Sequence, residues 1–584
     1  MVKTGIKKIR LIIKIFDKKQ KVSCIYMTFI MLINTVLELI GVSAIIPIIN
    51  AIAYPKDMND NIIINYISRI FRVTTPSIIV LLLAIGVSLI YIIKNTFSLY
   101  TIHKQIQFSY MGQRDLSNKL MKATIYQNYA YHKKKNSAEI MRDVRSDTSM
   151  FYVSILNLLQ LISESFISLA IVIYLAIVDM IITLGVIFCL AVTLAFFSRY
   201  YRRQISFCGY VRRESEARVN KDLLQILGGI KEIKVTNKEK YFLSRYYSDN
   251  AQFADSSSKY VFVTSLSKPI MEALVVTALM LLISIEFYFG MYGDNFITTL
   301  AVFAVAMFRL MPSVNKISSY LGCIITNIIV VDNIYNNLQA LRGSCLPAQN
   351  EKDKKNIEFR DKLSLRNVSF SYEDSDYYIL ENVNIDILKN QSVAFIGPSG
   401  AGKSTLADII LGLLKINQGK ILIDGNSIDE NLCGWHKIIG YIPQTIYLLD
   451  DTIRNNVAFG VKEDEIDDEE IMKVLKDAQL SDFVLNSENG LNTLIGENGV
   501  RLSGGQRQRI GIARALYEKP QILILDEATS ALDQDTERAV MEAVDYLQGR
   551  MTLIIIAHRL TTIKNCDVVY EVRNKKITKR EDIH

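Results

Sequence analysis

A glycine-rich segment that follows an apolar strand carries the clearest chemistry in this sequence. A strand is expected at residues 392–396 and a helix over residues 406–414. The segment between them reads Gly397-Pro398-Ser399-Gly400-Ala401-Gly402-Lys403-Ser404-Thr405. The spacing G-x-x-x-x-G-K-S predicts a phosphate-binding P-loop, in which backbone N–H groups and a helix N-terminus face the phosphates. We expect Lys403 to pair with the β- and γ-phosphates and Ser404 to hold Mg²⁺.

Two carboxylates stand at the end of a second apolar strand. The expected strand covers residues 522–527, and Asp526 and Glu527 end its apolar run. At such a position an Asp can reach a metal ion and a Glu can orient the attacking water. The alternative interpretation is a strand that ends in a solvated acidic turn.

A second anion site is expected where a Ser and two glycines open a helix. The segment Leu502-Ser503-Gly504-Gly505-Gln506 opens an expected helix that includes residues 507–517. A helix N-terminus attracts anions because its first N–H groups are unpaired. Since the P-loop already holds the phosphates of its own nucleotide, we expect this second site to contact a nucleotide that is bound by another copy of the domain.

The elements that position these segments belong to a membrane protein. The chain has 584 residues, 50% of them hydrophobic, and its long apolar blocks crowd the first 340 or so residues. Lys and Arg are dense before the first block, between the second and third, and between the fourth and fifth, which predicts that these segments are cytoplasmic. The first block is too long for a signal peptide, so it should remain in the mature protein. Six blocks are long enough to cross a bilayer core of about 30 Å: residues 22–51, 77–100, 151–178, 181–197, 260–288 and 296–331.

Composition excludes several other classes of protein. The net charge is +8, but the basic residues lie beside the apolar blocks and not in one patch interleaved with aromatic residues, so no nucleic-acid partner is expected. The seven cysteines have neither metal-ligand spacing nor the even number of a disulfide framework. A disordered, collagen-like or disulfide-stapled chain is therefore not expected.

The first outer loop contains an amphipathic pattern. Ile63, Tyr66, Ile67, Ile70 and Phe71 recur at the spacing of one helix face. The pattern predicts a helix that lies on the outer membrane surface or, equally, a short helix that caps the spanning helices without a role in binding.

In their order and spacing, these motifs resemble the nucleotide-binding domain of ABC transporters, and six spans with long inner loops resemble the membrane domain of ABC exporters. The resemblance implies a membrane α-helical domain of six transmembrane helices at residues 1–340, a linker at 341–356, and an α/β P-loop ATPase domain at 357–584. It also implies ATP and Mg²⁺ as cofactors, a homodimer in the lipid bilayer, and ATP hydrolysis coupled to transport.

The same resemblance implies roles for individual residues. Glu527, His558 and Gln444 would be catalytic, with His558 as the switch histidine near the γ-phosphate. Ser404, Gln444 and Asp526 would ligate the metal. Tyr372 would stack on adenine. The residues implied to bind ATP are Tyr372, Gly397, Ser399, Gly400, Gly402, Lys403, Ser404, Thr405, Ser503, Gly504, Gly505, Gln506 and Asp533.

Charged residues within or near the spans bear on the cargo, because ionised side chains are costly inside a membrane. They are Glu38, Lys94, Lys268, Glu272 and Arg309. The three cations could line one cavity and bind an anion. Alternatively, the two lysines reach the membrane interface and the two glutamates only neutralise them.

The segment at residues 308–313, together with Glu38, Gly41 and Pro47, resembles the bacterial lipid-linked oligosaccharide flippases. This implies that an anionic polyprenyl-pyrophosphate glycolipid, used in protein glycosylation, moves from the cytoplasmic to the outer leaflet of a bacterial inner membrane. The alternatives are an exporter of amphipathic drugs or lipids and an ATP-dependent membrane regulator that transports nothing.

Overall fold

The structure is a computed structural model. It describes residues 2–53, 62–72, 75–288, 296–342, 357–372, 375, 377–526, 534–557, 563 and 565–580, with some helical side chains in these ranges left undescribed. The chain divides into two compact units. The first unit comprises Met1–Ile125 and Asn136–Ser344, and the second comprises Tyr126–Lys135 and Cys345–His584.

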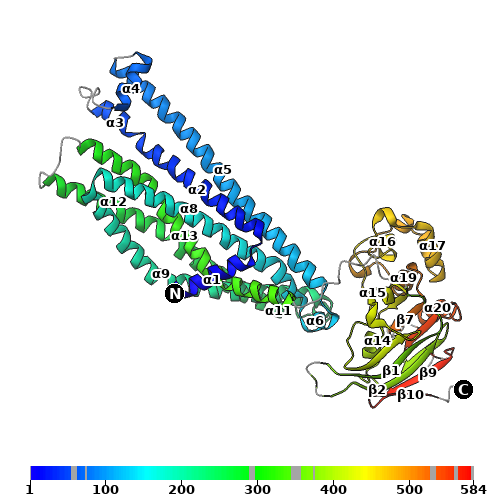
Figure 1. The fold of residues 1–584 in the computed structure, drawn as a ribbon. Helices are drawn as coiled ribbons and strands as arrows, with labels where there is room; N and C mark the ends of the chain where they lie inside the picture. The colour runs from blue at the N-terminus through cyan, green and yellow to red at the C-terminus, as the bar shows by residue number, and fades with distance from the viewer. Residues whose placement is uncertain are drawn as a thin grey trace. The chain divides into compact units, whose positions relative to one another are not determined.

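The first unit is helical, and several of its helices are much longer than a membrane is thick (Figure 1). At a rise of 1.5 Å per residue, the 50 residues of α5 span about 75 Å, more than twice the hydrocarbon core. The spanning helices therefore continue beyond the membrane. The helices of this unit are α1 (Val2–Ile15), α2 (Lys18–Ser43), α3 (Ile46–Ala53), α4 (Ile62–Phe71), α5 (Pro76–Ile125), α7 (Ser137–Met141), the π-helix η2 (Arg142–Asp147), α8 (Thr148–Val178), α9 (Met180–Gly228), α10 (Ile230–Val235), α11 (Glu239–Ser265), α12 (Ser267–Tyr288) and α13 (Phe296–Arg342).

Four helical segments among the described residues are long and apolar enough to cross a membrane: Lys18–Ile52, Pro76–Ile125, Glu139–Val178 and Thr299–Asn327. They coincide with the first, second, third and sixth predicted spans. The predicted span at residues 181–197 falls on α9, where many side chains lie outside the described residues.

The predicted span at residues 260–288 is divided in the structure. Helix α11 ends at Ser265 and α12 begins at Ser267. Pro269 follows this junction, and because proline has no N–H it cannot continue the hydrogen-bond ladder of α11. The predicted span at residues 260–288 therefore contains a break in its helix near its beginning.

Close packing inside the first unit depends on small residues at helix crossings. A Cβ atom placed on Gly112 of α5 would lie 2.2 Å from Cε1 of Tyr152 on α8. Tyr152 itself is 1% exposed and packs among Met31, Leu120 and Phe151. A larger residue at position 112 would separate α5 from α8.

The predicted amphipathic helix of the outer loop is present as α4. Ile64 is buried and packs with Ala51, Ile79 and Leu83. Tyr66, Ile70 and Phe71 belong to the predicted apolar face and are exposed in this single chain. One side of α4 thus caps its neighbours, and the other presents apolar side chains.

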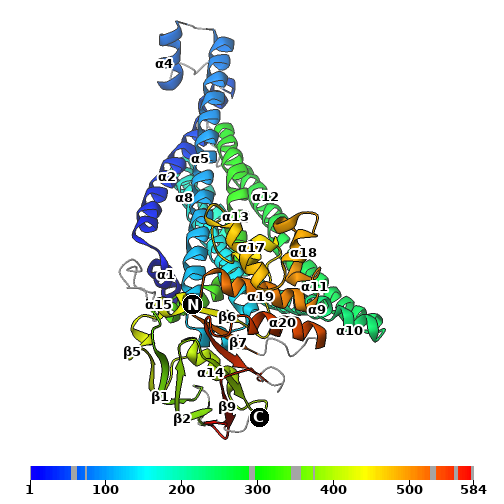
Figure 2. The same ribbon diagram turned by 90° about the vertical axis from the view of Figure 1, so that its right-hand side faces the viewer.

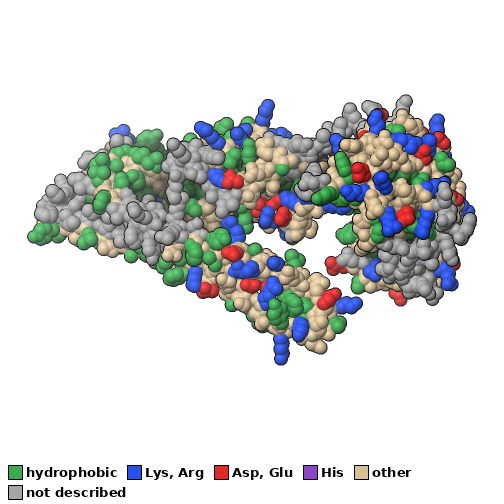
Figure 3. All heavy atoms as spheres, turned by 90° about the horizontal axis from the view of Figure 1, so that it is seen from below, with side chains coloured by type: hydrophobic (Ala, Val, Ile, Leu, Met, Phe, Trp, Pro, Cys, Tyr) green, Lys and Arg blue, Asp and Glu red, His purple; other side chains and the backbone are tan. Residues whose placement is uncertain are grey.

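Two antiparallel helices extend the first unit away from its apolar end. Helices α9 and α11 run side by side, and α10 joins their far ends (Figures 1 and 2). Seen from below, the part of this unit that projects at the lower centre of the view carries many Lys, Arg, Asp and Glu side chains among hydrophobic ones (Figure 3). The charge distribution agrees with the predicted cytoplasmic position of the long helical extensions.

The second unit contains two sheets. One is a six-stranded sheet of order β10-β9-β3-β8-β7-β6, in which β6, β7, β8, β3 and β9 are parallel neighbours, and the other is an antiparallel sheet of order β2-β1-β4-β5. The strands are β1 (Lys362–Phe370), β2 (Leu380–Leu388), β3 (Ser392–Ile396), β4 (Gln418–Ile423), β5 (Asn426–Ser427), β6 (Ile439–Ile442), β7 (Ile522–Asp526), β8 (Thr552–Ile556), β9 (Val568–Arg573) and β10 (Lys576–Lys579).

Short helices surround these sheets. They are α14 (Lys403–Ile410), α15 (Leu432–Lys437), α16 (Ile453–Val457), α17 (Asp468–Asp477), α18 (Ser481–Leu485), α19 (Gly504–Tyr517) and α20 (Gln534–Asp545), and α6 (Tyr129–Lys134) groups with this unit although it lies far away in the sequence. Helix α14 begins and ends earlier than the expected 406–414. Gly412 adopts φ +73°, a left-handed conformation that ends a helix.

Candidate functional site

The parallel strands bring the predicted nucleotide-binding segments to one edge of the six-stranded sheet. Phe395 of β3 and Asp526 of β7 both pair with Ile556 of β8, so the carboxyl ends of these three strands lie level. The P-loop follows β3, and Gln444 stands two residues after β6, which pairs in parallel with β7. In open α/β sheets this edge is where ligands bind.

Three glycines of the P-loop have backbone conformations that favour glycine. Gly397, Gly400 and Gly402 have φ of +150°, +79° and +101°. A Cβ atom on Gly397 would lie 2.3 Å from the carbonyl oxygen of Val572, and one on Gly402 would lie 2.8 Å from Cγ2 of Ile379. The turn therefore requires glycine at both of these positions.

The P-loop curls around the amine of Lys403. Nζ of this residue donates hydrogen bonds to the carbonyl oxygens of Gly397 (2.9 Å) and Pro398 (3.0 Å), and the residue is 4% exposed. Ser399 and Ser404, in contrast, are exposed at the mouth of the loop. This arrangement holds the lysine at the centre of the loop, where it can meet phosphate oxygens.

Tyr372 lies beside the start of α14. Its hydroxyl is 3.4 Å from the hydroxyl of Thr405, and its ring packs edge-on against Phe370 with 5.0 Å between ring centroids. An aromatic ring next to the first turn after the P-loop is well placed to stack on a base whose phosphates occupy that loop.

The oxygen-bearing residues at this edge suit Mg²⁺, which prefers hydroxyl, carboxylate and amide oxygens. Ser404 and Gln444 are exposed, and Asp526 is half-buried. Burial raises the pKa of the neighbouring Tyr441, and the negative charges of Asp526 and Asp408 raise it further. Within the described ranges, no group of three or more His, Cys, Asp and Glu side chains forms a separate metal site.

Three predicted site residues lie outside the described residues: Glu527, Asp533 and His558. The chain reaches them from described neighbours, since Asp526 ends β7 and Ala557 follows β8. Their predicted roles therefore depend on the sequence motif and on where these two strands end.

The second predicted anion site is the capped N-terminus of α19. Oγ of Ser503 accepts from the backbone N–H of Gln506 (3.2 Å), and Oε1 of Gln506 accepts from the N–H of Ser503 (2.9 Å). This reciprocal capping box defines where the helix begins. Ser503 is exposed, Gly504 is half-buried and Gly505 is buried.

We expect a mixed dimer of Lys403→Ala and Gly505→Asp subunits to keep one normal nucleotide site. If the P-loop of one copy meets the α19 N-terminus of the other, both defects fall in the same composite site and the second site stays intact. Binding stoichiometry of a fluorescent ATP analogue on the purified mixed dimer measures this. Two defective sites would contradict the arrangement in trans.

Helix α6 contributes a cation to the second unit that the sequence analysis did not identify. Nζ of Lys133 donates to Oδ2 of Asp408 on α14 (2.8 Å) and lies 5.8 Å from the ring centroid of Tyr372. Burial lowers the pKa of Lys133, but the hydrogen bond and charge of Asp408 outweigh it and raise the pKa above its usual value. The three consecutive lysines at 133–135 could not indicate from sequence alone that one of them pairs with Asp408.

Lys133→Gln should weaken the coupling between ATP use and transport and leave ATP binding intact. The Lys133 side chain is 40% exposed, so its ion pair contributes no more than about 1 kcal/mol, and we expect a two- to five-fold loss of transport per ATP hydrolysed. Lys135→Gln is the matched control, since it removes the same charge two residues further along the chain. Equal loss in both variants would contradict a specific role for Lys133.

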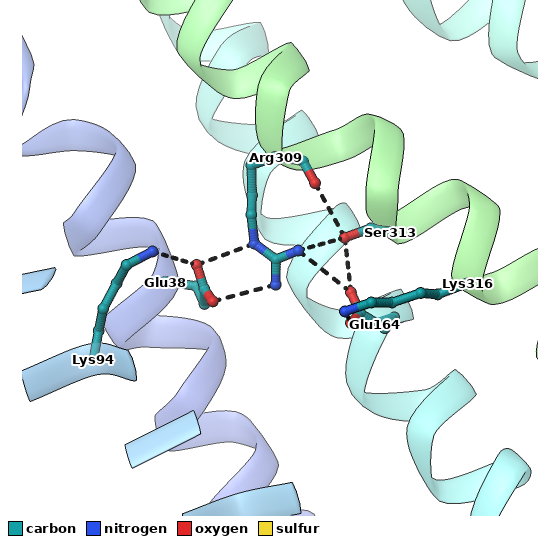
Figure 4. A network of polar contacts seen from close by, with 6 residues as sticks. All are labelled: Glu38, Lys94, Glu164, Arg309, Ser313 and Lys316. Carbon is teal, nitrogen blue, oxygen red and sulfur yellow. Dashed lines mark hydrogen bonds and ion pairs between the residues drawn. The ribbon is translucent and has the colours of Figure 1, made fainter. Parts of the chain in front are cut away.

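Charged residues of the first unit meet in a buried network (Figure 4). Glu38 accepts from Nζ of Lys94 (2.9 Å) and from Nε and Nη2 of Arg309 (3.1 and 3.2 Å). Glu38 and Lys94 are 5% and 7% exposed. A Cβ atom on Gly41 would lie 2.8 Å from Cδ of Lys94, so this glycine makes room for the lysine stem.

A second carboxylate extends the network on the other side of Arg309. Nη1 of Arg309 donates to Oγ of Ser313 (3.0 Å), Ser313 donates to Glu164 (2.7 Å), and Lys316 donates to the same carboxylate (2.8 Å). Three cations and two carboxylates therefore leave one excess positive charge at this network between α2, α5, α8 and α13, and the third cation, Lys316, is exposed at its edge. Glu164 was missed by the sequence analysis, although it stands inside a predicted span as Glu38 does.

The five charged residues singled out in the sequence therefore have different positions. Lys94 and Arg309 lie together, with Glu38 between them. Glu272 is exposed on α12, and the side chain of Lys268 lies outside the described residues. The pairing of Lys94 with Glu38 agrees with the neutralising alternative for that lysine, whereas the excess charge of the whole network does not.

Comparisons with known proteins agree with this fold and site. Residues 380–530 match the family model described as ABC transporter, and residues 23–314, half of the chain, match that described as ABC transporter transmembrane region. The solved structure of a bacterial Atm1-family ABC exporter with ATP bound is 22% identical, covers 95% of both chains and superposes with a TM-score of 0.75.

Three similar proteins are each named ATP-dependent lipid A-core flippase. That of Pasteurella multocida (strain Pm70) is 44% identical over 40% of this chain and 41% of its own length, and that of Photorhabdus laumondii is 34% identical over 63% of each. The alignment thus spans about two fifths and three fifths of these two relatives. The protein of Syntrophus aciditrophicus (strain SB) is 30% identical over 83% of this chain and 79% of its own. The chain belongs to the ABC transporter family, with the exporter fold and with its transmembrane region and ATP-binding domain in one polypeptide.

Proposed function

We propose that this protein, as a homodimer, uses ATP hydrolysis to flip an anionic glycolipid from the cytoplasmic to the outer leaflet of a bacterial inner membrane. The finer form of the proposal is a polyprenyl-pyrophosphate-linked oligosaccharide as cargo. The network around Arg309, in which three cations face two carboxylates, is the observation that carries it.

Electrostatics explains why such a network favours an anionic headgroup. An ionised residue at mid-membrane costs about 2.5–3.5 kcal/mol on insertion scales, and unpaired hydroxyls and phosphates are also costly in hydrocarbon. Cargo that carries a negative charge would neutralise the excess charge of the network. Its sugars could hydrogen-bond in the polar interior while its lipid tail stays in the bilayer.

The ATP site supports the energy source in this proposal. Lys403 would hold the β- and γ-phosphates, Ser404, Gln444 and Asp526 would ligate Mg²⁺, and Glu527 would orient the attacking water. The bound metal would neutralise phosphate charge. The N-terminus of α19 in a second copy would complete the site, so ATP binding would close two copies and hydrolysis would release them.

The proposal also assigns domain boundaries. Residues 1–340 form the transmembrane domain, 341–356 the linker and 357–584 the nucleotide-binding domain, with ATP hydrolysed on the cytoplasmic side. The basic segments before and between the spans support this orientation.

A second candidate cargo is a lipid A-core type of lipid, which the names of the relatives favour. A flipping assay in proteoliposomes separates the cargoes. Fluorescent pyrophosphate-linked glycolipid, lipid A-core and a neutral glycolipid are compared with and without ATP, with Lys403→Ala as the inactive control. We expect ATP-dependent flipping of the pyrophosphate-linked lipid at least about ten-fold faster than that of the neutral one, one tenfold step being about 1.4 kcal/mol.

Either of two results would overturn the proposal. Equal flipping of neutral and anionic glycolipids would remove the role of charge. ATP hydrolysis that no lipid stimulates, without movement of any cargo, would instead indicate a regulator that transports nothing.

A further inference from the structure

A cavity with charged residues in its lining lies in the first unit, apart from the Glu38 network. Its volume is about 270 Å³, and α8, α9, α11 and α13 contribute to its lining. Arg212, Arg213 and Glu216 of α9 line it together with Tyr260 of α11 and Thr326 of α13. Its charged lining therefore carries two cations and one carboxylate.

Both arginines of this cavity are held by uncharged groups, although Asp147 lies near enough to Arg213 for their charges to interact. The guanidinium of Arg212 lies 5.4 Å from the ring centroid of Tyr260, and Nη2 of Arg213 donates to the carbonyl oxygen of Thr326 (2.8 Å). Among the described residues neither arginine forms an ion pair, and this holds for Glu216 as a partner too. Arg309, in contrast, is paired with two carboxylates.

The backbone explains why these guanidinium groups reach α13. Gly209 stands three residues before Arg212, about one helical turn away. A Cβ atom on Gly209 would lie 2.9 Å from Cγ2 of Thr326. The glycine therefore lets α9 approach α13 closely, and the turn that follows places both arginines over the cavity.

The cavity lies at a different depth from the Glu38 network. Thr326 follows Arg309 by 17 residues on the same helix, which corresponds to about 25 Å along its axis. That distance is most of the thickness of a hydrocarbon core of about 30 Å. Because the positive-inside rule places Arg212 and Arg213 on the cytoplasmic side, the cavity lies near the headgroups of the cytoplasmic leaflet.

We infer that this cavity binds the phosphate of an anionic lipid headgroup in the cytoplasmic leaflet. A guanidinium group donates two parallel hydrogen bonds to a phosphate, and two such groups in the lining of one cavity suit a single tetrahedral anion. The aromatic face of Tyr260 holds Arg212 in place and leaves its N–H edges available. If the proposed function holds, the headgroup of the cargo binds first in this cavity and then at the Arg309 network. This order of binding rests on the proposed function.

The experiment measures binding of phosphatidic acid, a lipid with a single phosphate headgroup, to the full-length protein in detergent without ATP, by native mass spectrometry. In Arg212→Gln/Arg213→Gln we expect affinity to fall about ten-fold or more, as for lost charge-assisted hydrogen bonds. Lys231→Gln/Lys240→Gln is the matched control, because it removes the same charge at exposed sites of α10 and α11. Arg212→Lys/Arg213→Lys keeps the positive charge but loses the paired N–H donors of the guanidinium group, so it should bind phosphatidic acid with intermediate affinity.

Each outcome of this test has one meaning. Equal loss in the arginine and control variants, or no loss in either, overturns the site. If inorganic phosphate displaces the lipid from the wild type but not from the arginine variant, the site is supported. If inorganic phosphate binds as tightly as phosphatidic acid, the proposal that the bound phosphate belongs to a lipid is overturned. Because no ATP is used, a protein that flips nothing would still bind here, so this test and the flipping assay fail independently.

Discussion

Glu527→Gln should abolish steady-state ATP hydrolysis and preserve ATP binding. The amide has the shape of the carboxylate but cannot accept a proton from the attacking water. Loss of a positioned base typically slows a reaction by about 10²- to 10⁴-fold, and we expect a reduction of at least about 10²-fold here. Phosphate release by the purified protein in nanodiscs measures turnover, and a fluorescent ATP analogue measures binding.

The same substitution should trap the closed dimer with ATP bound, because closure no longer ends in hydrolysis. Lys403→Ala is the contrasting control, since it should lose ATP binding together with turnover. Turnover of Glu527→Gln within a few-fold of wild type would contradict the assignment of Glu527 as the base.

The nucleotide site could be predicted in detail because its chemistry requires certain residue types at fixed spacings. The strand predicted at 392–396 is present with those bounds, and the loop that follows uses the left-handed glycines that a tight approach to phosphate requires. The helix expected to open at the Ser-Gly-Gly segment and to include residues 507–517 begins at Gly504, where the Ser503 capping box starts it. Residues close together in the sequence determine these features, so a short stretch of sequence is enough to predict them.

Contacts between distant segments could not be predicted in this way. Glu38 and Arg309 are 271 residues apart, and Lys133 and Asp408 are 275 apart. Sequence alone identified Glu38 and Arg309 as costly charges in spans, but the choice of partner depends on how α2, α8 and α13 pack. The grouping of α6 with the second unit likewise follows from tertiary contacts, which no local pattern specifies.

Because Arg309 lies between two carboxylates, its substitution should affect the stability of the protein as well as the binding of cargo. Removal of one member of a buried ion pair leaves the other charged and unpaired, which typically costs about 3–5 kcal/mol. Arg309→Gln would leave Glu38 with Lys94 alone, and Glu164 with Ser313 and Lys316. Impaired flipping in this single variant could thus arise from lost stability as well as from lost binding of cargo.

Arg309→Gln should lower the flipping of a pyrophosphate-linked glycolipid at least about ten-fold, one lost charge-assisted hydrogen bond being about 1.5–3 kcal/mol, with basal ATP hydrolysis largely intact. Lys94→Gln and Lys268→Gln should have smaller effects. The double variant Glu38→Gln/Arg309→Gln removes one charge of each sign, so the network keeps its net charge.

In that double variant we expect thermal stability to recover while flipping stays impaired, because the guanidinium that would bind the headgroup is still absent. Both properties are measured on the same preparations, by thermal unfolding in nanodiscs and by proteoliposome flipping. Wild-type flipping by the double variant would mean that Arg309 serves only to neutralise Glu38. A parallel loss of ATP hydrolysis in both variants would show that the network holds the helices together and does not bind the cargo.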